Sequence, residues 1–429
     1  MNELNEQTIQ AKGYQLHLIP TKKFKTIHFV IKFKTNLARE MVTERALFPY
    51  VLRQGTVNYP SEQALQLKLD ELYGATLSLD VAKKGDHHIF SVRVAVANEK
   101  FIPDESTLID EAIQLLQEVI FNPLTEEGAF LETIFQREKK TLEKKIQSIV
   151  DNKIQYANLR LIDEMFKDER YSLHVHGYVE DLKTMTAKQL YEQYEKMLNE
   201  DQIDIYVLGD FNVATMQEKI ATAFVSLHEN DHSRLEINQE TSIISQINEV
   251  IEHQEIQQAK LHLGYRTNCT FSDNQYPALQ VFNGLFGGFP NSKLFMNVRE
   301  KHSLAYYASS QLDSHKGVLF VLSGIDHKDY EKAREIIEQQ MAAMKQGDFS
   351  DDDIAETKSM LINQILETLD HPQGIIELLY QQVVAEYQMP PEQFIAKINA
   401  VTKDDVINVA EKVVQDTVFL LTEKSGDHS

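Results

Sequence analysis

Residues 283–310, NGLFGGFPNSKLFMNVREKHSLAYYASS, predict a loop, a short helix and a strand in close succession. Glycines and Pro290 favour the loop, and a β-favouring run follows Ser303 as far as Leu312. Arg299 falls near the end of the expected helix, and Tyr306 falls in the strand. The glycines are Gly284, Gly287 and Gly288, the possible helix caps are Asn291 and Ser292, and the apolar helix positions are Leu294, Phe295 and Val298.

Arg299 and Tyr306 are candidate substrate-binding residues, because a guanidinium at a helix end and a phenol seven residues later can converge on one cleft. Both groups can hydrogen-bond a peptide backbone. A purely structural interpretation is also open, with the arginine in a surface ion pair and the tyrosine half-buried in a strand. On spacing alone, the structural interpretation is favoured.

The segment resembles the glycine turn, helix and Arg…Leu-Ala-Tyr stretch of the pitrilysin (insulinase) family, in its mitochondrial-processing-peptidase-like branch. The resemblance implies that Arg299 and Tyr306 hold substrate against a zinc site on another domain or chain. Two residues depart from the family pattern: Phe289 replaces a usual glycine, and Ser303 stands where glycine usually precedes Leu304. Both departures concern backbone freedom rather than the chemistry of the pair.

The bulk composition indicates a globular protein of at least two domains, with 429 residues, of which 42% are hydrophobic. A formal net charge of −22 argues against a nucleic-acid partner and is compatible with basic peptides or simply with solubility. The single cysteine, Cys269, excludes an intrachain disulfide. Because no signal-like start and no long apolar run is present, we expect a cytoplasmic location without a membrane partner.

The order of expected elements repeats along the chain, which predicts two homologous domains. Residues 142–152, LEKKIQSIVDN, resemble residues 361–371, LINQILETLDH, and each half ends in a predicted strand. The fold class is therefore α+β, and the resemblance implies for each domain an antiparallel sheet packed with helices, as in the LuxS and processing-peptidase-like metallohydrolase fold. The predicted boundaries are 1–225 and 241–429, with the polar stretch 226–240 as linker.

The first domain should carry the family's zinc motif, an inverted His-x-x-Glu-His helix with a later glutamate as third ligand. Aligning Gly55-Thr56 with the family's Gly-Thr places Ala46, Pro49 and Tyr50 at the motif positions. These side chains offer neither imidazoles for Zn²⁺ nor a general base. Inside a helix, Pro49 also removes a hydrogen bond at a cost of about 3 kcal/mol, so we expect the helix to kink or begin there.

The third-ligand position is basic as well, since the resemblance puts Lys144 and Lys145 where the family has paired glutamates. An ammonium group repels a dication. Two histidine pairs, His174/His176 and His87/His88, are the remaining metal candidates. With no carboxylate or cysteine at ligand spacing, surface or packing histidines are the simpler interpretation. We therefore expect no metal in this chain.

The resemblance implies a catalytically incomplete subunit that pairs with a partner chain carrying the intact HxxEH motif. Zinc is then expected in the partner, and this chain supplies Arg299 and Tyr306 to an unfolded peptide substrate. A heterodimer is expected, or a homodimer where the partner is absent. Open alternatives are a structural or scaffold subunit, a factor associated with elongation factor P modification, and a zinc endopeptidase with an unrecognised site.

Overall fold

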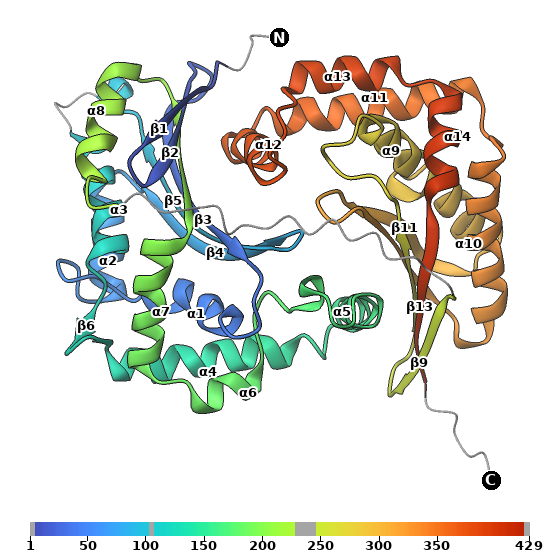
Figure 1. Ribbon diagram of the computed structural model, residues 1–429, viewed down its shortest axis with the longest axis horizontal. Helices are drawn as coiled ribbons and strands as arrows, with labels where there is room; N and C mark the ends of the chain where they lie inside the picture. Colours follow the sequence, from blue (N-terminus) through green and yellow to red (C-terminus); the bar gives the residue numbers. More distant parts are fainter. Residues whose placement is uncertain (1–4, 103–106, 228–245, 424–429) are drawn as a thin grey trace. The chain divides into compact units, whose positions relative to one another are not determined.

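The computed structural model describes residues 5–102, 107–227 and 246–423, which form two compact units (Figure 1). The first unit comprises the described residues of Met1–Ser148 and Leu173–Ile237, and the second those of Ile149–Ser172 and Asn238–Ser429. No helix of the described residues is long and apolar enough to cross a membrane. The expected linker at 226–240 lies outside the described residues except for its first two positions.

The first unit is built on a six-stranded sheet in the order β1-β2-β8-β3-β5-β4. Its pairings are antiparallel except for β2 with β8. The strands are β1 (Gln7–Ala11), β2 (Tyr14–Pro20), β3 (Thr26–Asn36), β4 (Thr76–Lys84), β5 (His87–Ala97) and β8 (Gln202–Gly209), with a separate small pair β6 (Thr125–Glu126) and β7 (Ala129–Phe130). The helices are α1 (Val42–Leu52), α2 (Glu62–Glu71), α3 (Leu108–Phe121), α4 (Glu132–Ser148), α6 (Val179–Thr184), α7 (Ala187–Glu200) and α8 (Val213–Ala223).

The main core of this unit lies between one sheet face and the helices, as strand periodicity requires. On β3, the core-facing residues Phe29, Ile31 and Phe33 alternate with the other face. Helix α3 contributes an apolar stripe that includes Ile113 and Leu116. Figure 1 shows α1, α3 and α7 together on this side of the sheet.

The second unit has a five-stranded sheet in the order β11-β12-β10-β13-β9, in which only β9 with β13 is parallel. Its strands are β9 (Asn248–Gln254), β10 (Ala259–Arg266), β11 (Ala305–Asp313), β12 (Val318–Ile325) and β13 (Val414–Glu423). Its helices are α5 (Lys153–Met165), α9 (Tyr276–Asn283), the π-helices η4 (Gly284–Gly288) and η5 (Phe295–Lys301), α10 (Tyr330–Lys345), α11 (Asp351–Thr368), α12 (Pro372–Val384), α13 (Pro391–Ala400) and α14 (Lys403–Lys412).

The two sheets share one topology, which confirms the predicted internal duplication. Read from β2, the first sheet runs β2-β8-β3-β5-β4, and read from β9, the second runs β9-β13-β10-β12-β11. Within these matched sets of five, the first strand in the chain pairs in parallel with the last, β2 with β8 and β9 with β13. The α+β fold is therefore as expected, with one parallel pairing in each otherwise antiparallel sheet. The sequence analysis missed β1 and β9.

Helix α5 precedes the predicted boundary in sequence but belongs to the second unit. Its residues Ala157 and Leu161 are fully buried in a cluster with Phe320 and Phe419 of β12 and β13. The approach to β10 is so close that a Cβ at Gly264 would lie 2.5 Å from the Met165 sulfur. The second sheet consequently has helices on both faces, with α5 on one and α9, α10 and α14 on the other.

Candidate functional site

Helix α1 occupies the place of the expected zinc helix and is continuous from Val42 to Leu52. We expected the helix to kink or begin at Pro49. It does not begin there, because Pro49 lies inside the helix and is buried. The proline cannot donate to the carbonyl of Arg45. Burial of neighbouring apolar side chains, including Leu47 and Phe48, offsets that loss.

None of the positions aligned with the zinc motif offers a metal ligand in this geometry. Ala46 is fully buried in the core and Tyr50 is half-buried, with a pKa raised by burial and by the nearby Glu138 carboxylate. On α4, which packs against α1, Lys144 and Lys145 are exposed. The residues present do not fit Zn²⁺, because methyl, phenol and ammonium groups replace two imidazoles and a carboxylate.

Next to this position lies a buried polar network that sequence reasoning missed. Arg45 of α1 is fully buried and lies 2.7 Å from the carboxylate of Asp201. It also donates from Nε to His88 Nδ1 at 3.2 Å and from Nη2 to the Phe33 carbonyl at 3.3 Å. Burial raises the pKa of Asp201, and the arginine only partly offsets this. Nothing in the local pattern marks Arg45, since arginine in a helix is ordinarily solvated.

This network removes His88 as a metal candidate. Its Nδ1 accepts from Arg45, so its Nε2 carries the proton and donates to the Val175 carbonyl at 3.2 Å. Burial, followed by the Arg45 charge, lowers the pKa of His88 to about 3. His174 stacks on the ring of Tyr178 at 5.0 Å. Among the described residues, no group of three His, Cys, Asp or Glu side chains could hold a metal ion.

The glycine segment before Arg299 is helical, where the sequence analysis expected a loop. Gly284–Gly288 form the π-helix η4, which continues directly from α9. Gly287 is required by packing, because a Cβ there would lie 2.6 Å from Ser310 Oγ and 2.7 Å from Leu294 Cδ1. Ser310 donates to the Asn283 side-chain oxygen at 2.7 Å, which fastens η4 to β11. Phe289, one of the two departures from the family pattern, has φ −129°, which any residue adopts.

Arg299 lies on the second π-helix, η5, which is held to the core by its buried Val298 and by Leu294, the residue before it. The Arg299 side chain is 44% exposed, and its guanidinium stacks on the ring of Phe295 at 4.6 Å. Its ion pair with Glu300 is long, at 3.5 Å, and lies in solvent. The guanidinium therefore keeps most of its donors available.

Tyr306 is 74% exposed, which makes it the second most exposed large hydrophobic residue among those described. The β11–β12 register shifts between Ala305 and Tyr307, so Tyr306 has no partner in the ladder and lies at a bulge. Bulges of this kind re-aim a side chain, and they are frequent next to functional sites. The neighbouring Tyr307 is half-buried, and burial raises its pKa. Because η5 packs on β11, Arg299 and Tyr306 come from adjoining elements.

Ser303 lies between η5 and β11 and has φ +52°. That left-handed conformation is the one for which glycine is usual, so a serine here is strained. The Ser303 N–H still donates to the Arg299 carbonyl at 3.0 Å, and the Leu304 N–H to the Val298 carbonyl at 3.0 Å. The turn that joins the arginine to the tyrosine is thus well defined.

Comparisons with known proteins agree with this geometry. A family model described as the peptidase M16 inactive domain matches residues 184–361. The probable inactive metalloprotease YmfF of Bacillus subtilis (strain 168) is 44% identical over 432 residues, which cover 99% of this chain and all of the relative. A conserved protein from Enterococcus faecalis V583 has a crystal structure that superposes with a TM-score of 0.92 at 37% identity, over 99% of this chain and all of that one.

A peptidase M16 inactive domain from Pseudomonas fluorescens shares the fold, with a TM-score of 0.81 at 16% identity over 99% of this chain. The 44% identity with YmfF over nearly the full length of both chains decides the family. It also confirms the resemblance that residues 283–310 carried. The chain belongs to the peptidase M16 family, and within it to the homologues without the catalytic zinc motif.

Proposed function

We propose that this chain is the non-catalytic subunit of a two-chain zinc metallopeptidase, in which it binds unfolded peptide and supplies Arg299 and Tyr306 to the partner's active site. The observation that carries the proposal is the exposure of these two side chains, 44% and 74%, on a rigidly packed turn. A chain that has lost its zinc ligands has no structural need for either group in solvent. A retained substrate-binding role accounts for both.

The chemistry required of the pair is hydrogen-bond donation. Arg299 offers a fixed fork of N–H donors, and Tyr306 offers one O–H. Directed at a peptide carbonyl, such donors hold the substrate and stabilise negative charge that develops on its oxygen. The partner, an HxxEH-bearing M16 chain, would contribute Zn²⁺ and the general base. The aligned motif positions of this chain offer neither, since they hold alanine, proline, tyrosine and two lysines.

The first experiment is to capture the partner. The tagged chain is purified from its native cells, and mass spectrometry identifies what accompanies it. The proposal expects an M16 protein with an intact HxxEH motif in near-stoichiometric amount, and cleavage of a fluorogenic peptide mixture by the complex. A chain that is recovered repeatedly without such a protein contradicts the proposal.

The second experiment measures steady-state kinetics of that complex with Arg299→Ala and Tyr306→Phe. If the pair stabilises developing charge, each substitution lowers kcat by about 10²- to 10³-fold. If it only holds the ground-state substrate, KM rises and kcat is unchanged. Lys301→Ala on the same π-helix and Tyr307→Phe on the same strand are matched controls, and both should retain near wild-type rates. Wild-type rates from Arg299→Ala and Tyr306→Phe would instead assign the chain a scaffold role.

A further inference from the structure

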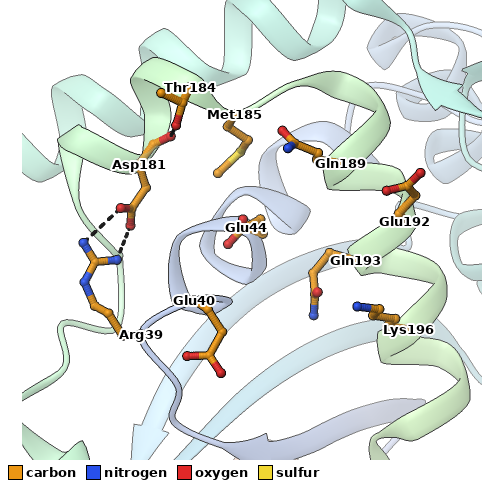
Figure 2. A pocket seen from close by; sticks show the side chains of 10 residues that line it. All are labelled: Arg39, Glu40, Glu44, Asp181, Thr184, Met185, Gln189, Glu192, Gln193 and Lys196. Carbon is orange, nitrogen blue, oxygen red and sulfur yellow. Dashed lines mark hydrogen bonds and ion pairs between the residues drawn. The ribbon is translucent and has the colours of Figure 1, made fainter.

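The first unit contains a cavity of about 340 Å³ at the start of α1, bounded by the loop before it and by α6 and α7 (Figure 2). The volume falls in the range of small-ligand sites. All of its lining residues belong to the first unit, so the cavity does not depend on Arg299, Tyr306 or a partner chain. They are Arg39, Glu40, Glu44, Asp181, Thr184, Met185, Gln189, Glu192, Gln193 and Lys196.

Helix α7 forms one wall with a single stripe of its surface. Gln189, Gln193 and Lys196 recur at the i, i+4 and i+7 spacing that puts side chains on one helix face. Thr186 and Gln189 form a capping box at the start of the helix. In it, the Gln189 side-chain oxygen accepts a hydrogen bond from the Thr186 N–H at 3.1 Å. Gln193 has no such role in the described contacts, so its amide is available to a ligand.

The opposite wall contains an ion pair between Arg39 and Asp181. Arg39 donates to both carboxylate oxygens of Asp181, at 2.5 and 2.9 Å, and stacks on the ring of Tyr178 at 4.0 Å. Thr43 donates to the same carboxylate at 2.5 Å. The pair lowers the pKa of Asp181 and raises that of Arg39. Arg39 is therefore not available to neutralise other carboxylates of the cavity.

Among the lining carboxylates described, Glu40 and Glu44 have no ion-pair partner, and Glu44 is the more buried of the two. It is half-buried, and among the described residues no lysine, arginine or histidine forms an ion pair with it. Burial raises its pKa, and the charges of Asp181 and Glu40 add to the effect, while a hydrogen bond from its own backbone N–H and the charge of Arg39 oppose it. Placing a carboxylate in such a site without a positive partner is unfavourable. Figure 2 shows Glu44 between Met185 and Gln193, near the middle of the lining residues.

We propose that this cavity binds the side chain of an arginine in a polypeptide. A guanidinium has five donors in one plane, and the cavity offers acceptors from two sides, the carboxylates of Glu40 and Glu44 and the amide oxygen of Gln193. Met185, which is buried, supplies an apolar surface for the aliphatic part of the side chain. A net charge of −22 favours the approach of basic polypeptides.

Isothermal titration calorimetry on the purified full chain tests the proposal, with salt near 150 mM to screen distant charges. The probes are Nα-acetyl-arginine amide, its lysine counterpart and the citrulline counterpart, which has the same shape as arginine but no charge. We expect arginine to bind at least tenfold more tightly than citrulline, as a charge-assisted hydrogen bond in a half-buried site predicts. Equal binding of arginine and citrulline overturns the proposal. Tighter binding of lysine overturns the assignment to arginine.

Variants separate the cavity from the general acidity of the chain. Glu44→Gln should weaken arginine binding at least tenfold, and Gln193→Leu should weaken it severalfold. The matched control is Glu218→Gln, which removes the same charge from an exposed position on α8 and should change the dissociation constant less than twofold. Circular dichroism confirms that each variant is folded. Equal losses from Glu44→Gln and Glu218→Gln would show attraction by net charge alone and would contradict a site.

Discussion

Gly287, Ser303 and Arg45 are each held in place by their surroundings, but in three different ways. Glycine at a packed position, such as Gly287, leaves a clear mark in the sequence. Ser303 is a weaker signal, because a left-handed serine looks like any other polar residue. Arg45 gives no signal, since its partners Asp201 and His88 lie far away in the chain. Sequence patterns report local needs, and the buried network is a long-range one.

Replacing Ser303 by glycine should stabilise the chain. At φ +52° a residue with a Cβ is strained by about 1–2 kcal/mol, and glycine would relieve this strain. Glycine also stabilises the unfolded chain, through its conformational freedom, by about 0.4–1 kcal/mol. The expected net gain in the free energy of unfolding, measured by urea denaturation, is therefore about 0–1.6 kcal/mol. Ser309→Gly, in the regular part of β11, is the control and should destabilise. A loss of stability in Ser303→Gly would mean that the turn is not strained.

At the scale of elements, α1 and α4 pack against each other, but the positions aligned with the zinc motif carry no metal-ligating side chains. The strand and helix order of both units was predictable, because apolar periodicity and turn residues are local. The two edge strands that were missed, β1 and β9, are mostly exposed and have little apolar pattern. Pro49 illustrates the opposite error, in which a strong local rule yields to core packing around α1.

The isolated chain should hold no stoichiometric zinc, because α1 presents Ala46 and Tyr50 and α4 presents Lys144 and Lys145. Elemental analysis after dialysis should find far less than one zinc atom per chain. The double variant His174→Ala, His176→Ala serves as a control, and its zinc content after dialysis should equal that of the wild type. One zinc per chain that survives dialysis and disappears in this double variant would contradict the prediction and would favour an unrecognised metal site.

For the whole molecule, the structure changes the meaning of the predicted boundary at residues 226–240. Residues 149–172 precede that boundary, yet they are part of the second unit, where α5 covers one face of the sheet. A cut in the predicted linker therefore does not separate the two units. Sequence analysis could not foresee this, since the amphipathic pattern of α5 shows that one face is buried but not which sheet it is buried against.

Trypsin cleavage after Arg234 should accordingly yield two fragments that remain together on size-exclusion chromatography. Leu161 and Ala157 of the first fragment stay packed against Phe320 and Phe419 of the second, and burial of such side chains is worth about 1.5–3 kcal/mol each. Leu161→Asp should release the fragments, since a carboxylate cannot be accommodated in this apolar cluster. Glu143→Gln on α4 is the control. Wild-type fragments that separate as stable, monomeric halves would show that α5 is dispensable to the second unit.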